Sequence, residues 1–305
     1  MHPDNAFYGH KRVLAEYAGL GSRPPAIRGH VQHGWTPSTG LSQPARLVSW
    51  LPKFVWSASN RKAAEERGIR TVEAIGAPFC YLDAMAPTEV SAPTAPRSTI
   101  YYPHHGWEWD ELLGSHRDVI AAIRDREEGP VTVCLYWNEF DQPTVRRLYE
   151  DAGFRVICHG YRHEALFLIR QRDELLRHDR VASNRLGTAL WYGGYLGRAV
   201  KLYGPTMSAE NEAEGRAFDQ YSRARWPELF DGGADGLTAR DMAADELGAA
   251  FVLPPDELRE ILGWTPRKLG YARPAQAAAR AEHHVRRMAY NVRARLPRTT
   301  PLPRF

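Results

Sequence analysis

Strand-like and helix-like segments alternate along residues 98–203, and this alternation limits the possible folds more than any other feature of the chain. Short runs rich in β-branched and aromatic residues are each followed, within about 10–15 residues, by a segment whose apolar residues recur at helical spacing. Parallel strands need a crossover of about a dozen residues between them, usually a helix, so the alternation predicts βαβ units and a parallel sheet. The expected strands are residues 98–102, 131–136, 155–159, 180–183 and 199–203, and the expected helices are residues 109–126, 143–152, 164–177 and 188–196.

The first part of the chain shows the same alternation in a shorter form. Ser59 or Asn60 is expected to cap a helix that ends at Gly68. A segment rich in Pro, Ser, Thr and Ala, residues 86–97, is expected to link the two halves. The expected helices before this linker are residues 9–18 and 59–67, and the expected strands are residues 27–32, 46–50, 53–56 and 71–75.

These elements predict an α/β chain with two Rossmann-like domains that face a cleft, followed by a helical C-terminal tail. The domains are expected at residues 1–90 and 91–205, and the helical extension at residues 206–305. The last helix, expected over residues 274–295, carries a narrow apolar stripe among arginines. This helix either packs back on the first domain or lies on a membrane surface.

Composition narrows the class of protein further. Of the 305 residues, 43% are hydrophobic and 25% are charged, an ordinary mix for a soluble globular protein. No apolar run reaches the ~18 residues of a membrane-spanning helix, and the N-terminus lacks the pattern of a signal peptide. Three cysteines in apolar runs predict reduced thiols in a cytoplasmic protein, with the inner face of the membrane as an alternative location. The net charge is +4, but the arginines of residues 98–205 are dispersed among acids, so no nucleic-acid partner is expected.

Three of the expected strands end in the same dipeptide, His-Gly. The pairs begin at His33, His105 and His159. Ligands of open parallel sheets bind outside the carboxyl ends of the strands, so the three pairs are expected to line one cleft. Glycine lets a backbone approach a ligand, and histidine can act as a base, an acid or a hydrogen-bond donor to phosphate. A solvated surface histidine is the competing interpretation for each of them taken singly.

A second signal lies where the expected strand 180–183 leads into the expected helix 188–196. Ser183, Asn184, Gly187 and Thr188 stand at this junction, where the amide groups and dipole of a helix start favour an anion. Ordinary N-capping by Ser, Asn and Thr is the alternative. The junction lacks the Gly-Lys-Thr of a Walker A loop, and the first strand lacks a dinucleotide fingerprint. A phosphate site without either motif favours a sugar nucleotide over ATP or NAD.

Polar residues also follow the expected strand 131–136. Asn138 and Glu139 are placed to reach a ribose, a base or an acceptor hydroxyl, and Glu139 with Asp141 can serve in acid–base chemistry. Asp141 stands just before Pro143, so capping of the following helix is the simpler interpretation of that carboxylate.

Four stretches together carry a resemblance to a known family: GHVQHGW, AIGAPFCYL, YYPHHGWEWD and VASNRLGTALWYGGYLGRAVKLYG. Over roughly residues 5 to 205 the chain resembles bacterial GT-B glycosyltransferases of surface-polysaccharide assembly, of the capsule and lipopolysaccharide types. Teichoic-acid glycerophosphotransferases are more distant in pattern. In those enzymes the turn reads His-Gly-Thr-Pro, whereas this chain has Trp35 after the His-Gly pair.

The resemblance implies a reaction and a set of site residues. It implies transfer of a sugar from a nucleotide-sugar donor to a glycan or lipid-linked acceptor, with no bound metal and no cofactor. His33 matches the catalytic histidine of the teichoic-acid enzymes and is expected to be the base, with Glu139 second. His10 and Trp35 are expected to contact the acceptor. The expected donor-binding residues are His104, His105, Trp107, Asn138, His159, Gly160, Arg162, Ser183, Asn184, Gly187 and Thr188.

Two other enzyme classes remain open from the sequence. A nucleotide-sugar epimerase of the same two-domain form would place histidines and carboxylates in the same cleft. A glycerophosphotransferase would use the same turn on a different donor.

Overall fold

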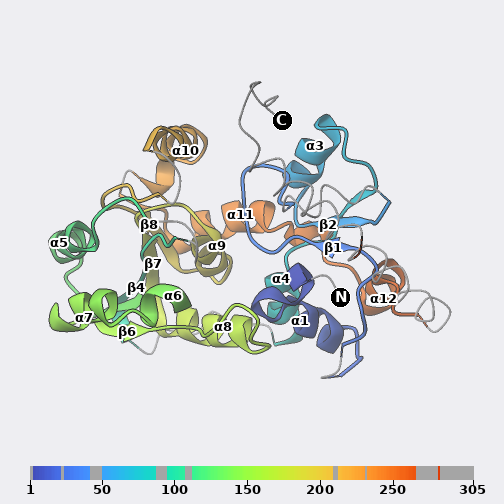
Figure 1. Cartoon of the computed structure of the whole chain (residues 1–305), viewed down its shortest axis with the longest axis horizontal. Helices are drawn as coiled ribbons and strands as arrows, with labels where there is room; N and C mark the ends of the chain where they lie inside the picture. Colours follow the sequence, from blue (N-terminus) through green and yellow to red (C-terminus); the bar gives the residue numbers. More distant parts are fainter. Residues whose placement is uncertain are drawn as a thin grey trace.

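The computed structural model describes residues 3–21, 24–41, 50–86, 95–106, 112–208, 212–230, 232–265 and residue 281. Two parallel sheets, each with its own helices, lie side by side along the long axis of the molecule (Figure 1). The predicted α/β class with two Rossmann-like units is therefore confirmed. The expected strand 46–50, the linker 86–97 and the last helix 274–295 lie wholly or mostly outside the described residues.

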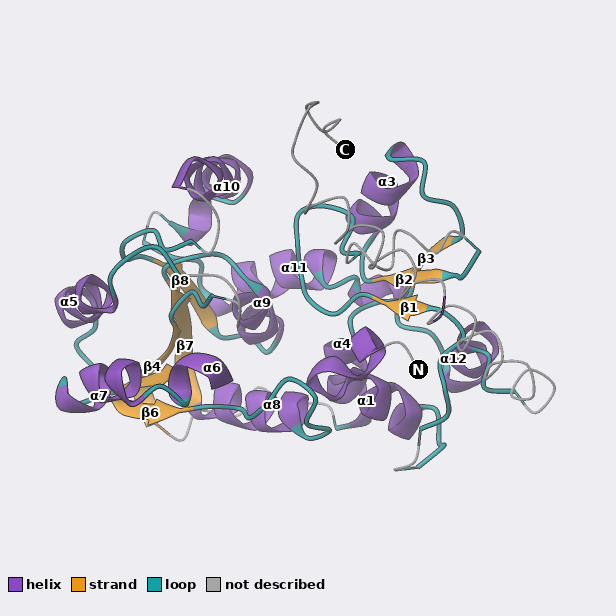
Figure 2. Cartoon of the chain, viewed as in Figure 1, coloured by secondary structure: helices purple, strands orange, loops and turns teal. Residues whose placement is uncertain are grey.

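The N-terminal sheet is small and entirely parallel. Its strands follow the order β1-β2-β3. Helix α3 lies on one side of this sheet, and helices α1 and α4 lie on the other (Figure 2). Ser57 caps α3 by accepting a hydrogen bond from the Asn60 amide, so the helix begins earlier than expected. The bounds are β1 (His30–Val31), β2 (Lys53–Val55), β3 (Val72–Ala74), α1 (His10–Tyr17), α3 (Ala58–Glu66) and α4 (Pro78–Met85).

The C-terminal sheet has five parallel strands in the order β6-β5-β4-β7-β8. The chain builds outward from β4 to β6 and then returns to the other side of β4. The sheet therefore has a topological switch point between β4 and β7, and the crevice at such a point is where ligands of open α/β sheets bind. The strands are β4 (Ala95–Tyr102), β5 (Val131–Cys134), β6 (Arg155–Ile157), β7 (His178–Ser183) and β8 (Ala199–Leu202). The helices that connect them are α5 (His116–Arg126), α6 (Trp137–Phe140), α7 (Pro143–Asp151), α8 (Phe167–Arg177) and α9 (Thr188–Tyr195).

Some expected boundaries in this half are wrong. The helix expected over residues 109–126 begins only at His116, because Ser115 caps it. Leu113, expected on that helix, instead forms an isolated antiparallel bridge with Ser208. The cap of α7 is Gln142 rather than Asp141, which closes the short helix α6. Neither α4 nor α6 was expected, because both are short and immediately follow a strand end.

The helical extension that follows the second sheet packs on both halves. It contains α10 (Glu212–Arg225), α11 (Gly236–Glu246) and α12 (Pro255–Leu262), and α11 lies beside α9 (Figure 1). After α11 the chain crosses to the N-terminal half, where the Ala77 amide donates to the Leu247 carbonyl over 2.8 Å. Gly248 has a φ of +67°, and a Cβ atom there would collide with the Trp56 carbonyl. Glycine is therefore needed for this close crossing.

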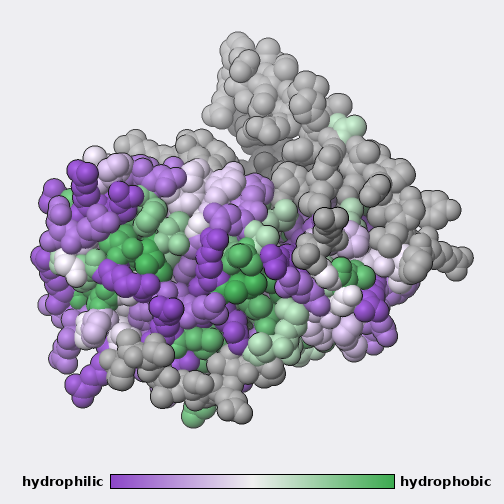
Figure 3. All heavy atoms as spheres, turned by 90° about the horizontal axis from the view of Figure 1, so that it is seen from below, coloured by the Kyte–Doolittle hydropathy of each residue, from purple (hydrophilic) through white to green (hydrophobic). Residues whose placement is uncertain are grey.

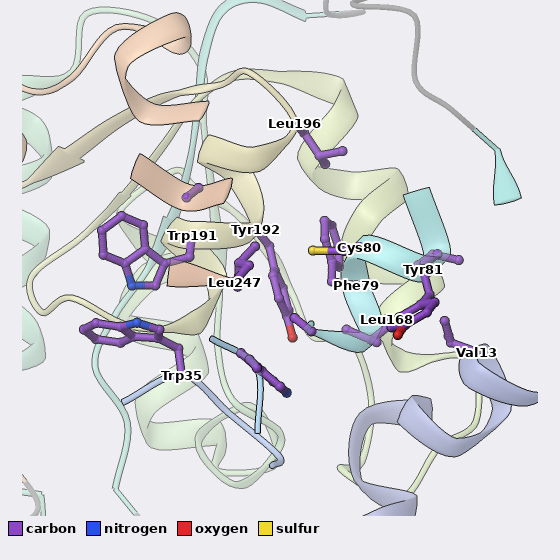
Figure 4. Packing of buried hydrophobic residues seen from close by; sticks show 14 of the residues in the cluster. Val13, Trp35, Phe79, Cys80, Tyr81, Leu168, Trp191, Tyr192, Leu196 and Leu247 are labelled. Atoms are coloured by element: carbon purple, nitrogen blue, oxygen red, sulfur yellow. The ribbon is translucent and has the colours of Figure 1, made fainter. Parts of the chain in front are cut away.

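One buried hydrophobic cluster extends through both halves. Phe79 of α4 stacks on Tyr192 of α9 with ring centroids 4.0 Å apart, which joins the two sheets' helices directly. Figure 4 shows this part of the core, with Trp35 and Trp191 close together. The sheets are consequently held as one body by burial of large aromatic side chains, each of which contributes on the order of 2–3 kcal/mol.

Among the helices that the structure describes, none has the length and hydropathy needed to cross a bilayer. On the face seen in Figure 3, hydrophobic side chains lie in separate groups divided by hydrophilic ones.

Candidate functional site

A cavity of about 470 Å³ lies where the carboxyl ends of the two sheets meet. Segments from both halves line it: residues 33–36 after β1, residues 102–105 at the end of β4, residues 134–137 at the end of β5, and residues 183 and 185–190 from the end of β7 to the start of α9. The cavity therefore includes the switch point between β4 and β7, the position predicted by the topology.

All three histidines of the His-Gly pairs line this cavity: His33, His105 and His159. Their glycines do not share one role. Gly34 also lines the cavity, whereas Gly160 does not. Gly160 has a φ of +100°, and a Cβ atom there would collide with the side chains of Glu164 and Arg170, so this glycine serves the turn rather than a ligand.

The start of helix α9 forms one wall of the cavity. Gly187 and Thr188 line it, and the first amide groups of a helix have no acceptor within the helix. Thr188 Oγ1 accepts a hydrogen bond from the Trp35 amide over 2.9 Å, which ties the His33 loop to the helix start. Ser183 Oγ accepts from the Arg185 amide over 3.1 Å. Both hydroxyls keep an O–H that can donate to a bound anion.

Arg185 belongs to this wall although the sequence did not single it out. Its Nη1 donates to His104 Nε2 over 3.1 Å, and its guanidinium lies 4.4 Å from the centre of the Phe218 ring. Burial, together with neighbouring His105 and Arg185, holds the pKa of His104 well below its usual value. Among the described residues that line the cavity, Arg185 is the only one with a permanent charge.

Two further cavity histidines, His105 and His159, are neutral at pH 7 because burial lowers the pKa of each. His105 stacks on Tyr136 with ring centroids 4.0 Å apart, its Nδ1 lies 2.9 Å from the Gly106 carbonyl oxygen, and burial lowers its pKa. His159 Nε2 lies 3.0 Å from the Tyr102 hydroxyl, and burial lowers its pKa to about 4. A neutral imidazole ring carries no charge and has one nitrogen that donates a hydrogen bond and one that accepts.

Glu139 is buried behind the cavity rather than exposed in its lining. Its Oε1 accepts from the Gly106 amide over 3.0 Å, and its side chain is only 6% exposed. Its Oε2 has no hydrogen-bond partner within the described part of the chain. Burial raises the pKa of Glu139 to about 7. The carboxyl group therefore anchors the turn after β4. Asn138, its neighbour, also lies outside the lining.

The raised pKa of Glu139 makes stability depend on pH. The unfolded chain releases this proton near ~4.3 and the folded chain near 7, so the folded state is penalised as pH rises through that window. Glu139→Gln removes the penalty and can still accept from Gly106. We expect the free energy of unfolding of E139Q, relative to the unmodified protein, to rise by about 2–3 kcal/mol between pH 5 and pH 8 in urea titrations. A difference that stays constant would mean that this carboxyl is charged throughout.

Several other predicted site residues are not part of the cavity lining. Asn184 joins two loops, accepting from the His104 amide over 2.8 Å and donating to the Pro205 carbonyl over 2.9 Å. The guanidinium of Arg162 lies over the Phe7 ring at 5.2 Å. His10 is 1% exposed, and burial lowers its pKa to about 3. Trp107 lies outside the described residues.

Trp35 lines the cavity, but its indole is committed elsewhere. The indole Nε1 donates to Glu246 Oε2 over 2.8 Å, and the side chain is 8% exposed. Its ring lies 5.3 Å from Trp191 and 5.4 Å from Trp226, so the three indoles form one cluster. Trp35 thus fixes the His33 loop against α9 and α11.

Comparisons with known proteins add structural similarities at low identity. No protein-family model matches the chain, and no curated protein matches it. A protein assigned as a UDP-N-acetylglucosamine 2-epimerase from Listeria monocytogenes is 14% identical, with a TM-score of 0.37, and the match covers 74% of this chain and 56% of that one. The UDP-GlcNAc 2-epimerase from Neisseria meningitidis is 13% identical, with a TM-score of 0.38, and the match covers 69% of this chain and 61% of that one. The wall teichoic acid polymerase TagF is 12% identical, with a TM-score of 0.36, and the match covers 87% of this chain and 67% of that one.

The chain thus spans less than two thirds of either epimerase structure. Similarities with TM-scores of 0.36 to 0.38 carry no argument about reaction or substrate.

Proposed function

We propose that this chain is a glycosyltransferase that moves a sugar from a nucleotide-sugar donor to a glycan or glycolipid acceptor in polysaccharide biosynthesis. In this proposal the reaction needs no bound metal and takes place in the cytoplasm. The donor phosphates lie against the start of α9, and His33 faces them from the N-terminal half.

One hydrogen bond carries the proposal: the Trp35 amide donates to Thr188 Oγ1 over 2.9 Å. This bond places the loop that contains His33 directly on the first residue of α9. A base that deprotonates an acceptor hydroxyl and a site that holds the leaving phosphate have to be close neighbours, because the acceptor attacks the carbon that bears that phosphate. His33 and Thr188 line the same cavity, which supports such an arrangement.

The negative charge on the leaving phosphate has to be stabilised by positive charge or by hydrogen-bond donors that point at it. The helix start at Thr188 supplies amide groups and the positive end of the helix dipole. Arg185 supplies a full charge, and the neutral histidines supply further hydrogen bonds. These groups are fixed before the ligand arrives, which is the condition for strong electrostatic stabilisation of a leaving group.

Arg185 provides the direct test of the donor site. We expect Arg185→Ala to raise the dissociation constant for the recognised nucleotide by about 10- to 100-fold, the scale of a hydrogen bond to a charged group. Calorimetry measures this change. Arg223→Ala is the matched control, because Arg223 lies over the Phe230 ring at 4.3 Å and does not line the cavity. Equal effects from the two substitutions would remove the phosphate role of Arg185.

The reaction class is tested by donor screening followed by turnover. A thermal-shift screen with UDP, GDP, CDP, CMP and dTDP compounds identifies the base, since a true ligand stabilises the fold by mass action. Incubation with the recognised nucleotide sugar should then release free nucleotide only when an acceptor is present. Conversion of the donor sugar without acceptor would instead identify an epimerase. Stabilisation by CDP-glycerol but by no nucleotide sugar would identify a glycerophosphotransferase.

A further inference from the structure

His10 and Trp35, the two residues expected to contact the acceptor, are both buried. His10 is 1% exposed, and the indole of Trp35 is occupied by Glu246 and by two other indoles. An acceptor has to reach His33 from a surface that solvent can reach.

A series of neighbouring aromatic rings leads from His33 to Trp137, and both of these residues line the cavity. Phe7 lies edge-on to His33 at 5.6 Å and to His163 at 4.7 Å. His163 lies 5.2 Å from Tyr161, and Tyr161 lies edge-on to Trp137 at 4.9 Å. We call Phe7, His163, Tyr161 and Trp137 the aromatic rim.

The aromatic rim is contributed by both halves of the molecule and is accessible. Trp137 lines the cavity, Tyr161 is 41% exposed, and His163 is exposed. Phe7 comes from the N-terminal half, Trp137 is the first residue of α6, and Tyr161 and His163 follow β6. The rim therefore runs from the cavity wall on one side to the proposed base on the other.

The chemistry of the rim fits a sugar ring. A pyranose ring has two faces that carry C–H groups and an edge that carries hydroxyl groups, so its faces are apolar and its edge is polar. Aromatic rings match the C–H face, and the Tyr161 hydroxyl can bond to hydroxyl groups. The guanidinium of Arg162 lies 5.2 Å from the Phe7 ring and 5.9 Å from the Tyr161 ring, which places a positive charge beside the same series. A glycerol phosphate chain has no flat apolar face that could stack on these rings.

We propose that the aromatic rim is the acceptor subsite and that it binds a saccharide by stacking, with the attacked hydroxyl directed to His33. This assignment rests on the proposed function, which it deepens by naming the acceptor as a sugar ring rather than a polyol phosphate.

Tyr161 is the residue chosen to test the aromatic rim, because its side chain is exposed and can be replaced without disturbing the core. The probes are cellobiose, maltose, lactose, N,N′-diacetylchitobiose and glycerol 3-phosphate, titrated separately and followed by saturation-transfer difference NMR. We expect at least one disaccharide to receive saturation at the C–H protons of one ring face. Tyr161→Ala should weaken that binding by roughly 2- to 10-fold, the scale of one aromatic contact.

Two further variants separate stacking from other causes. Tyr161→Phe keeps the ring and should retain most of the binding. Tyr221→Ala removes a tyrosine of similar exposure, 47%, that lies outside the rim and should change nothing. Absence of binding by all four disaccharides, equal binding by Tyr161→Ala, or binding of glycerol 3-phosphate alone would each overturn the assignment.

Nucleotide binding is measured on the same samples, so the two proposals can fail separately. Nucleotide binding without a Tyr161-dependent sugar signal rejects the rim and leaves the donor site. A Tyr161-dependent sugar signal in a protein that no nucleotide stabilises rejects the transferase and leaves a saccharide-binding surface.

Discussion

Replacing His33 with alanine is expected to cut turnover by roughly 10²–10⁴, the range for loss of a general base. The side chain lines the cavity, and the Trp35 amide bond to Thr188 fixes the loop that carries it. Because the donor phosphates are assigned to α9 and Arg185, nucleotide affinity should remain nearly unchanged. Single-turnover assays and calorimetry on the same variant measure the two quantities.

His33→Asn is the companion substitution. Asparagine keeps a polar group of similar reach but cannot take up a proton at neutral pH. Turnover as low as that of the alanine variant would therefore assign the loss to proton transfer rather than to a missing hydrogen bond. Full turnover in either variant would move the base to His105, which also lines the cavity.

Replacing Trp35 with alanine is expected to lower the free energy of unfolding by about 3–5 kcal/mol, the cost of truncating a large buried aromatic side chain. The ring packs against Trp191 and Trp226, and its loss also leaves the Glu246 carboxyl, whose pKa is raised by burial, without its indole donor. Denaturant unfolding followed by circular dichroism measures the change.

Trp35→Phe separates packing from hydrogen bonding. Phenylalanine fills most of the space but has no N–H, so we expect a smaller loss of about 1–3 kcal/mol from the unsatisfied carboxyl. A phenylalanine variant as unstable as the alanine variant would mean that the hydrogen bond to Glu246, and not the indole cluster, holds the loop.

The sequence predicts the order of strands and helices well and their exact ends less well. Helices such as α1 and α9 have apolar residues at helical spacing and a glycine near one end, so their bounds differ from the expected ones by a residue or two. Helix α5 starts later than expected because Leu112 and Leu113 fit a helical stripe, yet Leu113 pairs with Ser208, a partner nearly a hundred residues away. Spacing along the chain carries no information about such a pairing.

The candidate site was likewise predicted in part. The topology rule brings His33, His105, His159 and Thr188 to one cavity, and the strand ends are visible in the sequence. Burial is not visible there. His10 and Glu139 are polar residues next to loops, which resemble ligand contacts until the packing around them is known. Arg185 was overlooked because arginine is common throughout this chain, and only its bond to His104 distinguishes it.

The hydrophobic cluster shared by both sheets has a consequence for how a substrate enters. Enzymes with two lobes and separate cores can open by rotating one lobe about a hinge, since the interface between lobes is small and polar. Here such a rotation would pull Phe79 off Tyr192 and expose the indole cluster, at a cost of several kcal/mol for each large ring. The two halves are therefore held in one relative orientation. Access to the cavity depends on the short loops around its mouth rather than on rotation of one half against the other.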